Sequence, residues 1–583
     1  MTSSLKILDW TPEHFIANRT TCNKILNNPD VVKEIPSLNY VPLHYFRDRQ
    51  LVRFRGMIQD MHNPEYYFQR YEVRNTQSGL HETRSGMYAD FARCMTHEEI
   101  LFESEKNCSA ERHTCVIIST PGLNEWVKEK FKKPYCENSS TAMTFKRSFD
   151  QNDHEAMDCS EPVCKKDKVS LDEESKKMDT LEHNENRQTL VSKEYLLNLP
   201  IPVDDGIACI VKIYEDAAMK LNQIIEVIGF VSLDPLLSTC NMDETMTEAE
   251  LNVHHPPTSL VPRLHAVKLI QPLEAEIERA PDIMSKAKLI RSNLHLVLSQ
   301  LLFGDHLAAD YLICHLLSSI YMRRDYFCLG TYPLNLTHFS IGKYSTFAKD
   351  LYRFLTMFVE KSHLLEITLE NLNDLALSPK KDYDCNRLTS GLFQLSDNTH
   401  LVIDETGLTT GQVSPAGREN YNVICDLINF QKVTYDFKFY KMEYETDIPV
   451  LILSEAKSFI PCQNQVALKV DAESKDVYPH VIEIAEQYLK DENRLADIRQ
   501  YLKIIKSAKF EFDEEIVKEV QDDFVKMRQM HKNVSIDHLH SLMILARLLS
   551  LSHGSNTLTT EYWKMAVQME VERLGRLPEK KEV

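Results

Sequence analysis

Glycine is scarce in this chain, which has 15 glycines among 583 residues, or about 3% against a usual content of about 7%. Loops that hold the phosphates of a nucleotide depend on glycine, because their backbone N–H groups must come close to the ligand. A chain of this composition is therefore poor in phosphate-binding loops.

Close cysteine pairs are also missing. The 14 cysteines include no CxxC pair, and neither Cys108/Cys115 nor Cys159/Cys164 has the spacing of a zinc site. His254-His255 could suggest a metal ligand pair, but the prolines that follow favour an ordinary loop. We expect no metal site and reduced cysteines, as in an intracellular protein.

Long hydrophobic runs and an excess of basic residues are two further absences. No run of about 18 apolar residues occurs, and residues 1–15 lack the apolar core and cleavage site of a signal peptide. The net charge of −19 disfavours non-specific DNA binding, which needs clustered Lys and Arg against phosphates. These features predict a cytosolic or nuclear protein without membrane contact and without direct nucleic-acid binding.

The length and periodicity predict an α+β multidomain protein. Residues 1–45 form a helical segment and connector, and residues 46–272 an OB-like β-barrel domain. Residues 275–470 form an α/β domain, and residues 475–583 a helical region. An insertion at about residues 134–193 is polar and nearly free of aromatics, so we predict that it is disordered.

Basic pairs lie in or beside this insertion. They are typical of a nuclear-import signal, although for any single pair solvated linker charge is the favoured explanation. The pairs are Lys132-Lys133, Lys146-Arg147, Lys165-Lys166 and Lys176-Lys177.

Short strands interrupted by a long insertion favour the OB-like barrel. Arg53 and Arg55 alternate with apolar neighbours in the first strand, and Asn63-Pro64 predicts a turn after it. The predicted strands cover residues 51–62, 66–73, 86–93, 114–119, 208–214, 222–231 and 264–270.

OB barrels often bind single-stranded nucleic acid through stacked aromatics over a basic groove. A patch of aromatic and basic residues could serve that purpose, and the alternative is an aromatic core with solvated arginines. The patch consists of Tyr66, Tyr67, Phe68, Arg53, Arg55 and Arg70.

The second half contains a Gly-Asp stretch, residues 304–311, that opens an amphipathic helix. It resembles the phosphate-binding loop of the mini-chromosome maintenance (MCM) replicative helicases, glycine-aspartate-proline-glycine-x-alanine-lysine-serine. Beyond Gly304, the residues that contact nucleotide in that loop are replaced: the second glycine by Leu307, the lysine by Asp310 and the magnesium-binding hydroxyl by Tyr311. The alternative is a buried helix that merely begins with Gly-Asp.

Two further positions belong to this vestigial nucleotide site. An apolar strand ends in Asp404-Glu405, the Walker B pattern in which Asp supports Mg²⁺ and Glu polarises water. Asp537 occupies the place where the lid of MCM ATPases has an arginine that touches nucleotide. The resemblance thus implies a degenerate MCM/AAA+-like α/β domain with a helical C-terminal lid, no catalytic residue and no cofactor.

Secondary structure in this half follows from apolar spacing. Ser345 and Ser535 are predicted N-caps, and Thr559/Thr560 begin the last helix. Helices are predicted at residues 286–303, 345–359, 495–505, 513–530 and 536–551, and strands at 326–329, 364–369, 401–405 and 449–453.

Longer strings resemble the MCM-binding protein family over most of the chain. They are residues 41–45, 54–61, 211–216, 256–263, 304–325, 381–383, 386–388, 401–406, 522–525 and 542–551. The resemblance implies a nuclear, non-catalytic partner of MCM helicase subunits. Such a partner would act in DNA replication and sister-chromatid cohesion, by assembling, stabilising or unloading the MCM complex. Two alternatives remain: an active AAA+ ATPase of the MCM superfamily, or an OB-fold single-strand-binding protein.

Overall fold

The computed structural model describes residues 6–131, 192–234, 247–271, 280–324, 327–339, 346–470, 472–512, 514–530 and 536–577. All but the last two residues of the predicted insertion lie outside these ranges, as do the predicted N-caps Ser345 and Ser535. The chain on the two sides of residues 132–191 belongs to one compact unit. No helix in the described ranges has both the length and the hydropathy that a membrane span needs.

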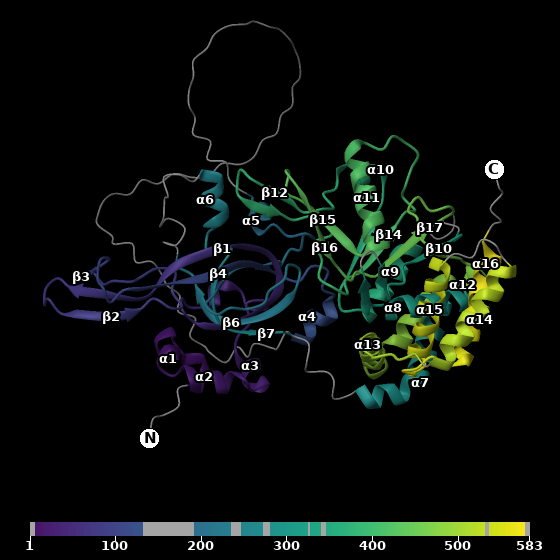
Figure 1. Ribbon diagram of the computed structural model, residues 1–583, viewed down its shortest axis with the longest axis horizontal. Helices are drawn as coiled ribbons and strands as arrows, with labels where there is room; N and C mark the ends of the chain where they lie inside the picture. Colours follow the sequence, from purple (N-terminus) through teal and green to yellow (C-terminus); the bar gives the residue numbers. More distant parts are fainter. Residues whose placement is uncertain are drawn as a thin grey trace, which may run out of the picture. The chain divides into compact units, whose positions relative to one another are not determined.

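Five strands of the N-terminal half form a ring. Their order is β1-β4-β5-β7-β6, and pairing of β6 with β1 closes it (Figure 1). Only β5 and β7 are parallel within the ring; the other neighbours are antiparallel. The strands are β1 (Leu51–Asn75), β4 (Cys108–Ile118), β5 (Ala208–Ile213), β6 (Ile224–Ser232) and β7 (Arg263–Ile270).

Alternation along the strands fills the ring with apolar side chains. Val52, Phe54 and Val211 belong to one buried cluster, whereas Arg53 and Lys212 come between such residues in sequence. Because neighbouring side chains of a strand point to opposite faces, the charged side chains lie on the outer face.

Two sequence predictions for this region are wrong. The predicted turn at Asn63-Pro64 is absent, because β1 runs on through both residues. The register with β4 shifts between His62 and Glu65, and such a bulge tolerates proline, which has no N–H to donate. The strand predicted at residues 86–93 is a loop; the partner of β1 here is β2 (His81–Ser85), with β3 (Glu98–Ile100) beside it.

Short helices surround the ring. Phe15 and Leu26 of the N-terminal helices pack with Phe230 of β6, and α4 and α5 border the part of the chain that is not described. The helices are η1 (Ile7–Asp9), α1 (Pro12–Ala17), α2 (Arg19–Leu26), α3 (Pro29–Glu34), η2 (Leu43–Tyr45), α4 (Glu125–Phe131), α5 (Lys193–Leu197) and α6 (Glu248–His254).

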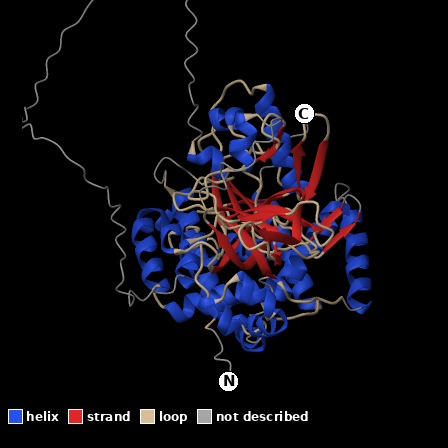
Figure 2. Ribbon diagram, turned by 90° about the vertical axis from the view of Figure 1, so that its left-hand side faces the viewer, coloured by secondary structure: helices blue, strands red, loops and turns tan. Residues whose placement is uncertain are grey.

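A parallel five-stranded sheet forms the centre of the second half. Its order is β11-β14-β17-β10-β18. All five residues of β14 and of β17 are buried, as expected for parallel strands that are covered on both faces, and helices flank the strands (Figure 2). The strands are β10 (Leu334–Thr337), β11 (Ser362–Glu366), β14 (His400–Asp404), β17 (Val450–Ser454) and β18 (Asn464–Ala467).

The remaining strands form two small sheets. One has the order β13-β12-β15-β16 and the other pairs β8 with β9. They are β8 (Met322–Arg324), β9 (Phe327–Leu329), β12 (Lys380–Asp382), β13 (Arg387–Thr389), β15 (Lys432–Asp436) and β16 (Lys441–Glu445).

The helices of this half confirm the predicted helical segments, including the start of the last helix, where Thr559 accepts a hydrogen bond from the backbone N–H of Tyr562. The helix α12 was not predicted individually, because Pro479 in its interior argues against a continuous helix. The helices are α7 (Ala280–Leu301), α8 (His306–Leu317), α9 (Phe347–Phe358), α10 (Leu369–Asp374), α11 (Pro415–Phe430), α12 (Ala472–Leu489), α13 (Glu492–Lys506), α14 (Glu514–Met530), α15 (Ile536–Ser552) and α16 (Thr560–Arg576).

The chain is therefore a mixed α/β protein with several sheets, one of them parallel, and helices at its C-terminal end. The mixture of strands and helices agrees with the α+β prediction from the sequence, and the division into several domains stays a prediction.

Candidate functional site

The carboxyl edge of the parallel sheet is where an open α/β sheet binds a ligand. Thr337, Asp404 and Ser454 are the last residues of β10, β14 and β17, which are neighbours in the sheet. The predicted Walker B pair, Asp404-Glu405, therefore lies at this edge.

Glu405 is held by its own chain. Its side chain accepts hydrogen bonds from the backbone N–H groups of Ile460 (2.9 Å) and Phe459 (3.2 Å). The hydroxyl of Ser454 lies 3.0 Å from Glu405 Oε2, and Glu405 is only 7% exposed. A carboxylate in these contacts holds the loop after β17 in place.

Asp404 has a local role as well. Its Oδ1 accepts a hydrogen bond from the backbone N–H of Thr406 at 2.9 Å. This bond closes a turn of the kind that aspartate often forms with the residue two positions on.

Gly304 ends a helix. Its backbone N–H donates to Ser299 O at 2.8 Å, and its φ of +84° is in the left-handed region that glycine adopts at the end of a helix. Asp305 then caps the next helix by accepting from the backbone N–H of Ala308. A phosphate-binding loop joins a strand to a helix, whereas residues 304–305 join the helices α7 and α8. The assignment of residues 304–311 to a vestigial nucleotide site stays a prediction.

The other members of the predicted loop have structural contacts. Asp310 Oδ1 accepts from Arg291 Nη2 at 2.6 Å, and Leu307 is buried in the core of the helices. The hydroxyl of Tyr311 donates to Glu570 Oε2 at 3.1 Å. Among the described side chains, no hydrogen bond or ion pair joins this group to Asp404 or Glu405.

A buried ion pair explains the tyrosine at position 311. Arg573 donates to both oxygens of Glu570, at 2.6 and 2.8 Å, and both residues are buried. Burial alone would raise the pKa of Glu570, but the hydrogen bonds and charge of Arg573 hold it below its ordinary value. Tyr311 thus satisfies a charged group that connects α8 to α16.

Asp537 is exposed in the first turn of α15. A negative charge there stabilises the helix through its dipole. The structure gives it no contact with Asp404 or Glu405 among the interactions of the described residues, so its assignment to a nucleotide site stays a prediction.

The aromatic and basic residues proposed for single-strand binding do not share one surface. Tyr66 and Tyr67 are adjacent in β1 and so point to opposite faces. Arg53 is largely buried and pairs with Glu226 at 3.1 Å, while Arg55 stacks on the ring of Phe131. The remaining two, Phe68 and Arg70, lie further along β1.

Sequence reasoning missed a buried charged cluster on the outer face of the ring. Asp90, Lys212 and His265 are each less than 10% exposed and contact one another. The available signal was a charged residue inside an otherwise apolar strand, as in residues 208–214 and 264–270. In the described part of the chain, no group of three His, Cys, Asp or Glu side chains is arranged to hold a metal ion.

Comparison with known proteins places the chain in a family. A model described as "Mini-chromosome maintenance replisome factor" matches residues 22–577. The chain belongs to this family. It is 37% identical to the mini-chromosome maintenance complex-binding protein of Homo sapiens, over 95% of this chain and 93% of that protein.

Relatives from other animals agree. The protein of the same name from Drosophila melanogaster is 34% identical over 98% of this chain and 97% of its own length. The protein from Danio rerio is also 34% identical, over 94% of this chain and 91% of its own length. The family resemblance predicted from the sequence is confirmed. The family match includes the ring, the parallel sheet and all of α16.

We expect Glu405→Gln to lower the free energy of unfolding by about 1–3 kcal/mol, because it removes the charged acceptor of two backbone N–H groups. We also expect magnesium-ATP to leave the unfolding transition of both proteins unchanged. Urea denaturation with and without magnesium-ATP measures both effects. The exposed neighbour Glu455 supplies the control, since Glu455→Gln should change stability by less than about 0.5 kcal/mol. Stabilisation of the wild-type chain by micromolar ATP, lost in Glu405→Gln, would contradict this assignment.

Proposed function

We propose that the protein is a non-catalytic binding partner of MCM helicase subunits in DNA replication. The observation that carries the proposal is membership of a replisome-factor family along nearly the whole chain. The relatives that share this length are named as complex-binding proteins. A nuclear location and a part in sister-chromatid cohesion belong to the same proposal.

We propose further that the ring is an OB-like barrel. A small closed sheet of five strands is the architecture of that fold, and the ring has five strands with one parallel pair. The separation of the aromatic and basic residues of β1 argues against the single-strand-binding function that many OB barrels have.

The parallel sheet supports a degenerate AAA+-like domain. In P-loop proteins the phosphate loop follows a strand and opens a helix, and the connection from β10 to α9 has this form. Its residues 340–345 lie outside the described part, but the sequence can be compared. The pattern G-x-x-x-x-G-K-[ST] would begin at Thr337, keep Gly342 and Lys343, and place Tyr344 at the magnesium-binding hydroxyl.

Loss of nucleotide chemistry therefore rests on different residues from those predicted. Thr337 replaces the first glycine, Tyr344 replaces the small hydroxyl residue, and Glu405 is engaged by the loop after β17. These changes support a domain that keeps the shape of an ATPase neighbour without turning over ATP. Such a domain could contact an MCM subunit side to side, as ATPase domains contact each other in a ring.

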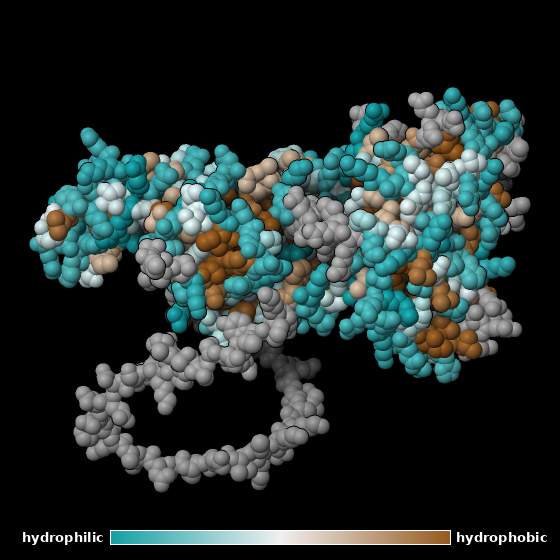
Figure 3. Space-filling view, turned by 90° about the horizontal axis from the view of Figure 1, so that it is seen from below, coloured by the Kyte–Doolittle hydropathy of each residue, from teal (hydrophilic) through white to brown (hydrophobic). Residues whose placement is uncertain are grey.

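Exposed hydrophobic side chains provide surface for such a contact. Patches of them interrupt the hydrophilic surface (Figure 3), and exposed patches often mark protein-binding sites. On α7, Leu289 and Leu296 are 64% and 51% exposed; seven residues apart, they share one face of the helix. Trp563 is fully buried, so it supports the fold from within.

We expect the immobilised full-length chain to capture purified MCM complex. A variant that lacks residues 134–193 should capture it equally well, whereas a fragment ending at residue 270 should bind at least tenfold more weakly. Lys343→Ala should not change capture, because the proposal requires no nucleotide on this chain. Circular dichroism of each variant confirms folding.

Two results would count against parts of this proposal. Full MCM affinity in the fragment ending at residue 270 would assign the contact to the ring domain. Loss of capture in folded Lys343→Ala would show that a nucleotide on this chain is needed.

A further inference from the structure

A cavity of about 290 Å³ opens on the outer face of the ring. Thr114 of β4, Lys212 of β5 and Arg263 of β7 line it, together with Glu65 of β1. Lys381 of β12, a strand in the second half of the chain, also lines this cavity. The lining therefore combines side chains from five strands.

Two carboxylates hold the cations of this cavity in place. Asp90 lies 3.2 Å from His265 Nε2, 3.3 Å from Lys212 Nζ and 3.5 Å from Arg263 Nη1. Burial would raise the pKa of Asp90, but these neighbours hold it well below its ordinary value. Asp90 is thus a carboxylate at neutral pH.

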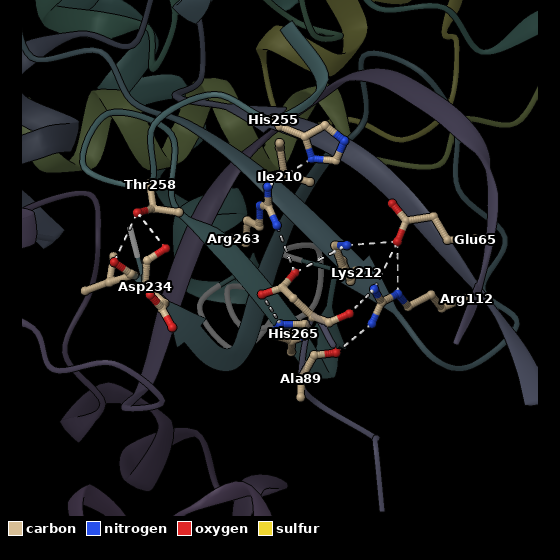
Figure 4. Close-up of polar contacts among 12 residues, drawn as sticks. Glu65, Ala89, Arg112, Ile210, Lys212, Asp234, His255, Thr258, Arg263 and His265 are labelled. Carbon is tan, nitrogen blue, oxygen red and sulfur yellow. Dashed lines mark hydrogen bonds and ion pairs between the residues drawn. The ribbon is translucent and has the colours of Figure 1, made fainter. Parts of the chain in front are cut away.

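Glu65 is the second carboxylate. Its Oε2 accepts hydrogen bonds from Lys212 at 2.8 Å and from Arg112 at 3.1 Å (Figure 4). Although burial would raise the pKa of Glu65, these two cations lower it to about 2. Glu65 is thus also charged at neutral pH.

Positive charge remains in excess around the cavity. Among the described side chains, four cations, Lys212, Arg112, Arg263 and Lys381, surround or line it. Against them stand the carboxylates of Asp90, Glu65 and Asp60, the last of which lies 3.9 Å from His62 of the lining. Burial lowers the pKa of His255, and the charge of Arg263 lowers it further, so this imidazole adds no charge at pH 7. The balance of these described side chains is about one positive charge, in a chain whose net charge is −19.

An unused hydrogen-bonding group faces the same space. The hydroxyl of Thr114 is buried and has no hydrogen-bond partner. Thr114 is paired with Lys212 across β4 and β5, so both side chains leave the sheet on the same face. A buried hydroxyl without a partner is costly, and an acceptor beside Lys212 would satisfy it.

We propose that this cavity binds the phosphate group of a small phosphate monoester. The excess of positive charge around the cavity favours an anion as the ligand. The phosphate oxygens can accept from the Thr114 hydroxyl and from Lys212, a point charge of the kind that binds phosphate. A volume near 300 Å³ is at the lower end for small-molecule sites. This inference is independent of the proposed binding to MCM.

Calorimetric titration of the full-length chain with inorganic phosphate, at constant ionic strength and pH 7.5, tests the site. We expect binding in the submillimolar range. Phosphoserine and adenosine monophosphate, titrated in the same way, show which kind of monoester the cavity prefers. Absence of phosphate binding at 10 mM (a concentration about tenfold above the expected range) would overturn the proposal.

Two variants locate the binding. Thr114→Val keeps the shape of the side chain and removes the hydroxyl, so we expect about tenfold weaker binding of phosphate with no loss of stability. Lys381→Gln at the partly exposed side should weaken binding about fivefold. The matched control is Lys380→Gln, because Lys380 is exposed and points to the opposite face of β12. Equal affinity in all three variants would place the phosphate elsewhere and overturn the proposal.

Discussion

Replacing Arg573 by alanine is expected to lower the free energy of unfolding by about 3–5 kcal/mol. Arg573 and Glu570 are 4% and 8% exposed and share two hydrogen bonds. The substitution leaves the Glu570 carboxylate buried, with the neutral hydroxyl of Tyr311 as its nearest remaining donor. Urea denaturation followed by far-ultraviolet circular dichroism, which reports the C-terminal helices, measures the effect.

Two controls separate the ion pair from simple loss of a side chain. Arg528→Ala removes an exposed arginine of α14 and should change the free energy by less than about 0.5 kcal/mol. The double variant Glu570→Leu/Arg573→Met removes both charges and should recover most of the lost stability, because apolar side chains of similar size replace a buried pair well. A loss below about 1 kcal/mol in Arg573→Ala would mean that Glu570 does not depend on this partner.

The sequence predicted the parallel strands more reliably than the first strand of the ring. Residues 401–403 and 449–453 are continuously apolar because both faces of their sheet are covered. The sequence of each strand alone therefore indicates that it is buried. The full length of β1, by contrast, could not be predicted from its own sequence. Asn63-Pro64 has the local chemistry of a turn, and only the pairing of β1 with β4 makes it a bulge.

The structural role of the Gly-Asp pair at residues 304–305 could not be read from local sequence. A Gly-Asp pair ends one helix and caps the next as readily as it begins a phosphate loop, since both uses depend on backbone N–H groups at a helix start. What distinguishes them is the element that precedes the pair. Here that element is the helix α7 and not a strand.

The partners of buried charged side chains could not be predicted from the sequence either. The lysine inside the apolar segment 208–214 indicates a special environment, because lysine is rarely buried unless it is paired. Its partners, Glu65 and Asp90, come from a bulged strand and a loop, and neither has a local signature. The fold alone brings them together.

Two buried histidines are expected to make the protein sensitive to acid. His315 Nδ1 lies 2.7 Å from Tyr332 O, and its Nε2 lies 2.8 Å from His400 Nε2. Because a carbonyl only accepts, His315 donates through Nδ1 and accepts through Nε2 from His400. His400 Nδ1 is then left without a hydrogen-bond partner in the core. Both rings are neutral in this arrangement.

Burial lowers the pKa of His315 to about 4 and that of His400 well below its ordinary value. An unfolded histidine has a pKa of about 6.5, so between pH 6.5 and about 4 the unfolded chain binds more protons than the folded one. Stability from these residues is fully present above pH 6.5 and is lost as the pH falls. The loss is about 1.4 kcal/mol per pH unit for each histidine.

We therefore expect His400→Leu to reduce the stability lost between pH 7 and pH 5 by about 2 kcal/mol, the share of one histidine over about 1.5 pH units. Urea denaturation at pH 7, 6 and 5 measures this difference directly, because the comparison does not depend on how much the substitution changes the free energy of unfolding at pH 7. His480 is exposed, with a side-chain exposure of 78%, so His480→Leu should leave the pH dependence of the wild type unchanged. If the free energy of unfolding of His400→Leu fell with pH as steeply as that of the wild type, His400 would already be protonated in the folded protein. The assignment of two neutral rings would then be wrong.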